Sequence, residues 1–171
     1  FTAEVASTVN ESLLMHHLLD KETNETMRRY LINYYIEEFR TTLFRQTMFA
    51  EFEMLTHKEV ENGGVLTAEW MCKLYNDLNH QYFGSALAPD DYIQYEWARI
   101  PHFYRAFYVY QYATGYSAAT AISAKILAEG EAARKNYIEF LKSGSSNDPV
   151  ELLKIAGVDM SSPEPIRMAM E

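Results

Sequence analysis

A histidine followed by closely spaced tyrosines is the part of this sequence whose residue types could do chemistry. The run from His102 to Tyr116 holds five of the chain's 13 tyrosines, and four of them recur at every fourth position. These four are Tyr104, Tyr108, Tyr112 and Tyr116. On a helix this spacing places the four phenols along one slowly turning face. Because each buried hydroxyl without a partner costs roughly 1–3 kcal/mol, such a row indicates a wet cleft rather than ordinary core packing.

His102 heads this row, directly after Pro101, and two roles are open for it. At the start of a helix, its ring can simply satisfy exposed backbone groups. Beside several phenols, a neutral imidazole can instead donate a hydrogen bond to a carbonyl oxygen as that oxygen gains negative charge. The tyrosine side chains, each an apolar ring with a hydroxyl at its tip, would equally suit a groove that holds an extended peptide.

Glu4 is a second candidate, because it shares a helical face with Thr8 and Glu11 and lies among small residues. A metal or a second helix could approach its carboxylate closely, although an acidic helix face is more often only solvated. The five histidines are His16, His17, His57, His80 and His102. None of them forms the HExxH pair with which metallopeptidases bind zinc. Cys72, a lone thiol on an amphipathic helix, is more typical of packing than of a nucleophile.

The elements that position these residues are predicted to be helices. No glycine occurs before Gly63 and no proline occurs in that stretch, so the strongest helix breakers are missing. The pattern predicts a helix over residues 2–19 and a polar turn over residues 20–24. Thr23 or Asn24 can cap a long second helix that ends at the Gly63 turn.

Start and stop signals predict the later helices as well. Thr67 begins a third helix that Gly84 ends, and residues 85–101 are an irregular connection. Pro101 then sets up the histidine–tyrosine helix, which continues into the alanine-rich residues 117–127.

The last part of the chain carries two further helix signals. Gly130 separates the alanine-rich segment from a helix over residues 131–142. Asp148 provides a cap and Pro149 occupies the first helical position of a short helix that ends at Gly157. No alternating strand pattern occurs, so the predicted fold class is all-α.

Composition limits the classes of function. The 171 residues are 48% hydrophobic, which is enough for one domain with a real core. The net charge of −9 would repel nucleic acid. No apolar run approaches the roughly 20 residues that a membrane helix needs. A single cysteine excludes an internal disulfide framework and favours a reducing compartment, so we expect a cytoplasmic protein with no membrane partner.

Both ends of the chain look cut. Phe1 begins without methionine and already in helical register, while the helix onset near Pro163 stops at Glu171. We therefore expect residues 1–171 to be one helical unit from a longer protein.

Two long motifs resemble a known family. The segment from Phe1 to Glu11 resembles the one that follows the HExxH helix in the oligoendopeptidase F branch of the thimet oligopeptidase family of zinc peptidases. The run from His102 to Tyr116 resembles the substrate-binding helix of that family. Residues 148–153 resemble the C-terminal end of the family's sequences. The resemblance covers the whole chain in order. It implies the multi-helix C-terminal portion of a zincin-type peptidase domain.

The resemblance also implies residue roles. It implies that Glu4 is the third zinc ligand and that Glu11 supports the site. It implies that His102 contacts the substrate near the scissile carbonyl. The tyrosines that bind the substrate backbone and stabilise the tetrahedral intermediate would come from Tyr108, Tyr112 and Tyr116.

The family's two zinc histidines and its base glutamate lie before the position of Glu4 and are not in this sequence. Since catalytic zinc takes three protein ligands and a water, we expect this chain alone to be inactive and to need the missing N-terminal part of its protein. The intact enzyme would hydrolyse internal bonds of short peptides. The alternatives are a noncatalytic helical module whose aromatic groove binds a peptide or a helix, and a purely structural bundle.

Overall fold

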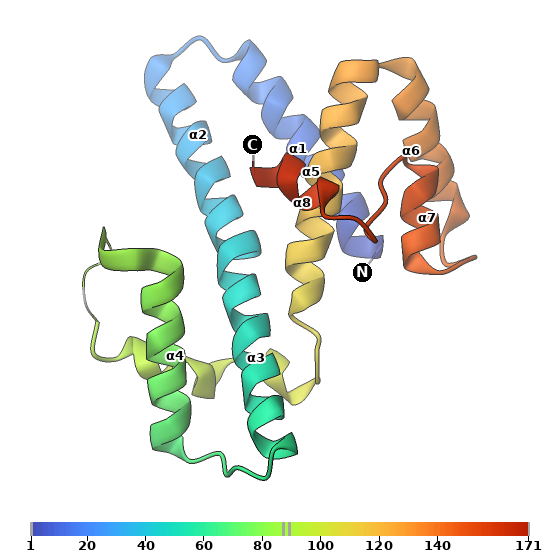
Figure 1. Cartoon of the computed structure of the whole chain (residues 1–171). Helices are drawn as coiled ribbons and strands as arrows, with labels where there is room; N and C mark the ends of the chain where they lie inside the picture. The colour runs from blue at the N-terminus through green and yellow to red at the C-terminus, as the bar shows by residue number, and fades with distance from the viewer. Residues whose placement is uncertain (1, 87, 89, 171) are drawn as a thin grey trace. The chain divides into compact units, whose positions relative to one another are not determined.

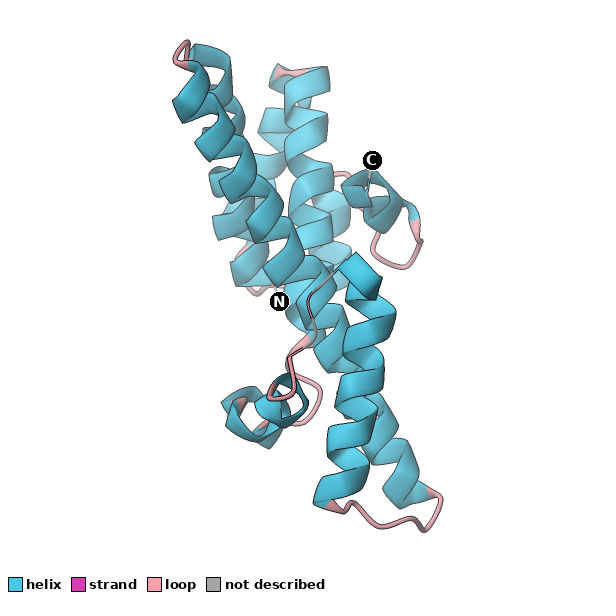
Figure 2. Ribbon diagram, turned by 90° about the vertical axis from the view of Figure 1, so that its left-hand side faces the viewer, coloured by secondary structure: helices cyan, strands magenta, loops and turns pink. Residues whose placement is uncertain are grey.

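The computed structural model describes residues 2–86, 88 and 90–170, and every regular element in these ranges is helical (Figure 2). The prediction of an all-α fold is confirmed. The elements are α1 (Thr2–Lys21), α2 (Glu25–Phe39), η1 (Arg40–Phe44), α3 (Arg45–Glu61), α4 (Ala68–Phe83), η2 (Gly84–Ala86), η3 (Ile93–Arg99), η4 (Pro101–Tyr104), α5 (Tyr110–Glu129), α6 (Glu131–Ser143), α7 (Pro149–Ile155) and α8 (Glu164–Met170). None of the described helices has the length and apolar character that a bilayer crossing requires.

The chain divides into two compact helical units. The first unit comprises Phe1–Leu43 and Gln111–Glu171, and the second comprises Phe44–Tyr110. The expectation of one helical unit over residues 1–171, cut from a larger catalytic domain, concerns the longer protein and stays a prediction.

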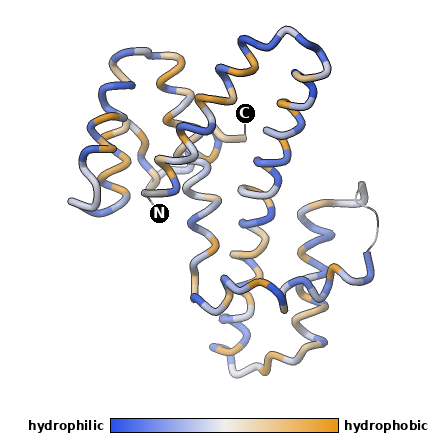
Figure 3. Tube along the Cα trace, turned by 180° about the vertical axis from the view of Figure 1, so that it is seen from behind, coloured by the Kyte–Doolittle hydropathy of each residue, from blue (hydrophilic) through white to orange (hydrophobic). Residues whose placement is uncertain are grey.

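The turn between α1 and α2 forms as its polar residues predict. The Asn24 side chain caps α2, because its Oδ1 accepts a hydrogen bond from the Met27 N–H at 3.0 Å. The Glu22 carboxylate in turn accepts from the Asn24 N–H at 2.7 Å. This turn is coloured as hydrophilic at the top of Figure 3. The cap fixes where α2 begins and allows α1 and α2 to lie side by side.

The core of the first unit forms where α1 meets the alanine-rich part of α5 (Figure 1). Val5 and Val9 of α1 are fully buried there, as are Ala118 and Ala121 of α5. Small residues on α5 let the two helices approach closely. Tyr137 of α6 joins this core through its ring, while its hydroxyl donates to the Ala6 carbonyl oxygen at 3.1 Å. The buried contacts hold the first turns of α1 against α5.

The long second helix contains an interruption that the sequence did not reveal. Five residues, Arg40–Phe44, form the π-helical segment η1 between α2 and α3. The Thr41 hydroxyl donates to the Glu37 carbonyl oxygen at 2.8 Å and so satisfies an acceptor in the turn before η1. Segments of this kind are frequent near functional sites, because the extra residue per turn redirects the side chains that follow.

The second unit has an aromatic core beside the largely enclosed carboxylate of Glu96. α4 packs against α3 and η3, and Phe52 of α3 contacts the rings of Tyr75 and Trp97. Glu96 on η3 accepts a hydrogen bond from the Tyr75 hydroxyl at 2.5 Å. Arg45 forms an ion pair with the same carboxylate. The charge of Glu96 is therefore paired inside the unit.

The prediction that His102 to Tyr116 form one helix is wrong. η4 ends at Tyr104, residues 105–109 are not helical, and α5 begins at Tyr110. Phe107 causes the break, since its φ of 57° is incompatible with a right-handed helix. Its N–H donates instead to a carboxylate oxygen of Glu53 at 2.6 Å. The row of four tyrosines is thus divided: Tyr112 and Tyr116 lie on α5, whereas Tyr104 and Tyr108 precede it.

Candidate functional site

Glu4 lies in the first turn of α1, with an exposed side chain, close to α5. Gly115 makes this approach possible. A Cβ atom at position 115 would lie 3.9 Å from the Cβ of Glu4 and 3.9 Å from a methyl carbon of Val5. Within the first unit, the fold therefore brings the candidate metal ligand next to the helix that carries Tyr112 and Tyr116.

Tyr116 is the most enclosed of the candidate tyrosines. Its side chain is 5% exposed, and its ring meets Phe39 edge to face with centroids 6.0 Å apart. Burial, together with the nearby Tyr35 and Glu38, raises the pKa of Tyr116, so its hydroxyl remains protonated at neutral pH. Tyr112, one turn earlier on α5, is only partly buried. The two phenols therefore differ in how easily a ligand could reach them.

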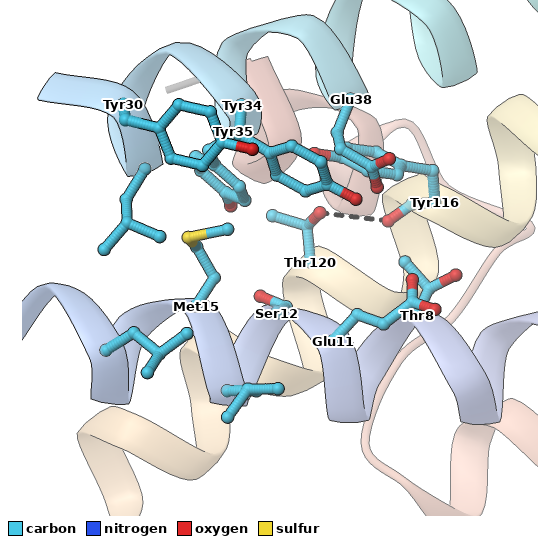
Figure 4. A pocket seen from close by; sticks show the side chains of 13 residues that line it. Thr8, Glu11, Ser12, Met15, Tyr30, Tyr34, Tyr35, Glu38, Tyr116 and Thr120 are labelled. Atoms are coloured by element: carbon cyan, nitrogen blue, oxygen red, sulfur yellow. Dashed lines mark hydrogen bonds between the residues drawn. The ribbon is translucent and has the colours of Figure 1, made fainter. Parts of the chain in front are cut away.

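A pocket of about 320 Å³ lies among α1, α2 and α5 of the first unit (Figure 4). Thr8 and Glu11 of α1 line it, and they belong to the helical face that Glu4 begins. Tyr116 and Glu38 line it from the other two helices. The prediction that Glu4, Thr8 and Glu11 share one face is consistent with this arrangement. The pocket begins one helical turn after Glu4.

His102 and Tyr108 lie together in the second unit. Their rings stack with centroids 5.7 Å apart and planes 16° from parallel. The Arg105 guanidinium lies 5.0 Å from the centre of the Tyr108 ring, at a distance where a cation is attracted to an aromatic face. His102 itself is exposed, whereas Tyr108 is partly buried. The stack limits how the imidazole can turn and leaves it accessible to a ligand.

Glu53 of α3 holds the segment that carries this stack. Glu53 is 4% exposed, and its carboxylate accepts the hydrogen bond from the Phe107 N–H. The Phe107 ring also packs on His57, with centroids 4.6 Å apart. Sequence reasoning missed this support. A signal was available, because Glu53 follows the apolar Phe49 by four residues and so falls on the same helical face, where a solvated glutamate is not expected.

The candidate site residues fall into two groups. Glu4, Tyr112 and Tyr116 belong to the first unit, while His102 and Tyr108 belong to the second. Each group is assembled within its own unit, and the joint action of the two groups remains a prediction.

The donor chemistry of Glu4 fits one position of a zinc site. Carboxylate oxygens are common zinc ligands, and no ion pair in the described part of the chain engages Glu4. Residues 2–86, 88 and 90–170 nevertheless contain no group of three or more His, Cys, Asp or Glu side chains that could hold a metal ion. Because a catalytic zinc takes three protein ligands, Glu4 could supply at most one of them.

Comparison with known proteins decides the family. The model that describes peptidase family M3 matches residues 1–171. The chain belongs to peptidase family M3. Among its relatives in that family, oligopeptidase PepF of Bacillus subtilis is 56% identical over 169 residues, and the match covers 99% of the chain and 25% of the relative. The plasmid-encoded oligoendopeptidase F of Lactococcus lactis subsp. cremoris is 46% identical over 171 residues, and this match covers 100% of the chain and 28% of the relative.

Two solved structures are similar to the chain. The crystal structure of oligoendopeptidase-F from Enterococcus faecium matches with a TM-score of 0.94 and 48% identity, over 99% of the chain and 33% of that structure. A putative peptidase from Chlamydophila abortus matches with a TM-score of 0.90 and 42% identity, over 97% of the chain and 28% of that structure. The chain thus spans between a quarter and a third of the lengths of these relatives.

Proposed function

We propose that this chain is the C-terminal part of a zinc-dependent oligoendopeptidase that hydrolyses internal bonds of short peptides. The names of the family M3 relatives support the reaction class. The contact that Gly115 allows between α5 and the turn of Glu4 carries the structural argument, because it puts a free carboxylate beside the tyrosine helix. The single cysteine supports a reducing, cytoplasmic location.

Glu4 is the zinc ligand in this proposal. Its exposed carboxylate would occupy one coordination position, and the missing N-terminal part would provide two histidines and the glutamate that acts as general base. Bound zinc supplies Lewis acidity that polarises the peptide carbonyl and lowers the pKa of a water toward about 7. The burial of Val5 and Val9 anchors α1 on α5 and so fixes the turn that carries Glu4.

His102 and a tyrosine have the role of hydrogen-bond donors to the developing oxyanion. His102 is exposed and held in orientation by its stack on Tyr108, so its N–H can be presented without reorganisation. Partly buried Tyr108 and Tyr112 can offer their hydroxyls in the same way. Preorganised donors of this kind lower the barrier because they are aimed at charge that develops only in the transition state.

The test uses the full-length protein and short internally quenched peptides. Hydrolysis at internal bonds, identified by the masses of the products, is expected to stop on treatment with a chelator and to return with zinc. The His102→Ala variant should lose on the order of 10²-fold or more in kcat with little change in KM. Residues 1–171 alone, supplied with zinc, should not hydrolyse the peptides.

Binding of peptides by the metal-loaded full-length protein without any cleavage would contradict the proposal and would favour the noncatalytic binding module. Wild-type turnover by His102→Ala would instead contradict the role of the histidine.

A further inference from the structure

The pocket of the first unit is negatively charged. Glu11 of α1 and Glu38 of α2 both line it, and its lining includes no lysine, arginine or histidine (Figure 4). Neither carboxylate takes part in an ion pair within the described ranges of the chain. A partly enclosed space with two unneutralised carboxylates attracts a cation more strongly than open surface does, because less water screens the charges.

Away from its two carboxylates, the pocket has mainly apolar walls. Met15 and Leu18 of α1 and Leu31 of α2 contribute aliphatic surface, and Tyr30 adds an aromatic face. An occupant with a hydrocarbon stem and a charged tip would match both kinds of wall. Aromatic faces also attract cations directly. Lysine and arginine side chains have this construction, whereas an inorganic cation would leave the apolar walls uncovered.

Tyr34 lies in the field of both carboxylates. The charge of Glu38, burial and a hydrogen bond to Glu38, with a further contribution from Glu11, raise the pKa of Tyr34. Its phenol therefore stays protonated and keeps donating to Glu38 at neutral pH.

The pocket lies within reach of a peptide held at Glu4. Glu11 follows Glu4 by two helical turns, which at 1.5 Å per residue is about 10 Å along α1. An extended peptide advances roughly 3.3 Å per residue, so a long side chain one or two residues from the bond at Glu4 can extend into the pocket.

We propose that this pocket binds the side chain of a lysine or arginine in the peptide substrate and so gives the peptidase a preference for basic residues near the cleaved bond. The inference rests on the proposed function, since it assumes that peptides are bound at Glu4. Glu38 and Glu11 would pair with the cation, while the aliphatic and aromatic residues would cover its stem.

The experiment measures binding to the metal-free full-length protein, so that its result does not depend on catalysis. Short peptides with one lysine at each successive position are compared with the same peptides carrying norleucine, by calorimetry. At one position the lysine peptide should bind about tenfold more tightly, as charge-assisted hydrogen bonds predict. The Glu38→Gln variant should remove most of that preference.

Glu37→Gln is the matched control, because Glu37 lies next to Glu38 on α2 but pairs with Arg40 and does not line the pocket. It removes the same charge from the same helix and should keep the preference within about twofold, as expected for an exposed ion pair. Retention of the preference by Glu37→Gln and its loss in Glu38→Gln would assign the preference to this pocket.

Equal affinity for lysine and norleucine at every position would overturn the inference. A preference that survives Glu38→Gln would overturn it too, because the cation would then bind elsewhere. If Glu38→Gln lowers only the unfolding temperature of the full-length protein, the pocket is filled by the protein's own chain, and the inference is also wrong. Failure of the proposed function gives a different result, namely peptide binding without hydrolysis by the zinc-loaded wild type.

Discussion

Gly115 of α5 faces Glu4 of α1 at a distance that leaves room for a methyl group. The Cβ that glycine lacks would lie 3.9 Å from the Cβ of Glu4, which is an ordinary van der Waals separation. A larger side chain would have to displace the turn that carries the carboxylate. Position 115 therefore controls how closely the tyrosine helix approaches the proposed metal ligand.

Substitutions at Gly115 should show whether a methyl group is tolerated there and whether a larger side chain displaces Glu4. Gly115→Ala fits the space and gains up to about 1 kcal/mol of helix propensity, so the full-length protein should keep its zinc affinity. Gly115→Leu should lower zinc affinity by about tenfold or more, because it displaces Glu4 without changing any ligand. Competition with a chromogenic chelator measures both affinities. A leucine variant with wild-type affinity would show that α5 does not position Glu4.

The candidate tyrosines should differ in their importance for turnover. Tyr116 is buried against Phe39, whereas Tyr108 and Tyr112 are only partly buried. We expect Tyr116→Phe to keep kcat within about tenfold of wild type, and Tyr108→Phe or Tyr112→Phe to lower it on the order of 10²–10³-fold with little change in KM. Steady-state kinetics of the full-length variants provide the comparison. A large loss confined to Tyr116→Phe would reverse this ranking.

Glu96 should make stability sensitive to acid. Burial alone would raise its pKa, but the hydrogen bond from Tyr75 and the charges of Arg45 and Arg99 outweigh burial, so the pKa of Glu96 lies below its ordinary value. A lowered pKa in the folded state stabilises the protein above the unfolded-state pKa of about 4.3. That contribution is lost as the pH falls through the lower, folded-state value.

Thermal unfolding of the full-length protein between neutral and acid pH checks this dependence. The wild type should lose stability below about pH 4.3, and Glu96→Gln should be less stable at neutral pH with a weaker dependence on acid. Glu131→Gln is a suitable control, because the Glu131–Arg134 pair is exposed and such pairs contribute little. Identical pH profiles for Glu96→Gln and the wild type would contradict the role of Glu96.

Local sequence signals predicted most of the helices. Asn24, Thr67 and Asp148 each cap a helix through a side-chain oxygen within a few residues, and such contacts depend only on nearby sequence. Gly84 likewise ends α4 with a positive φ of 63°. These features were predictable because the interacting groups are neighbours along the chain.

The break before α5 was not predictable in the same way. The tyrosine spacing favoured a continuous helix, but the bond between Phe107 and Glu53 joins residues 54 positions apart. The acidic pocket has the same character, since Glu11, Glu38 and Tyr116 come from three helices that only the tertiary fold assembles. Interactions between distant segments therefore decided the structure here, and the spacing of residues along one helix cannot predict such interactions.

The most direct test of the account is the zinc content of the full-length protein with Glu4→Gln. Asp20→Asn, which removes an exposed carboxylate from the other end of α1, is the control. After dialysis and elemental analysis, we expect about one zinc per wild-type molecule and per Asp20→Asn molecule, and a large loss of zinc from Glu4→Gln. A Glu4→Gln protein that retains its zinc and its peptidase activity would contradict the claim that this carboxylate binds the catalytic metal.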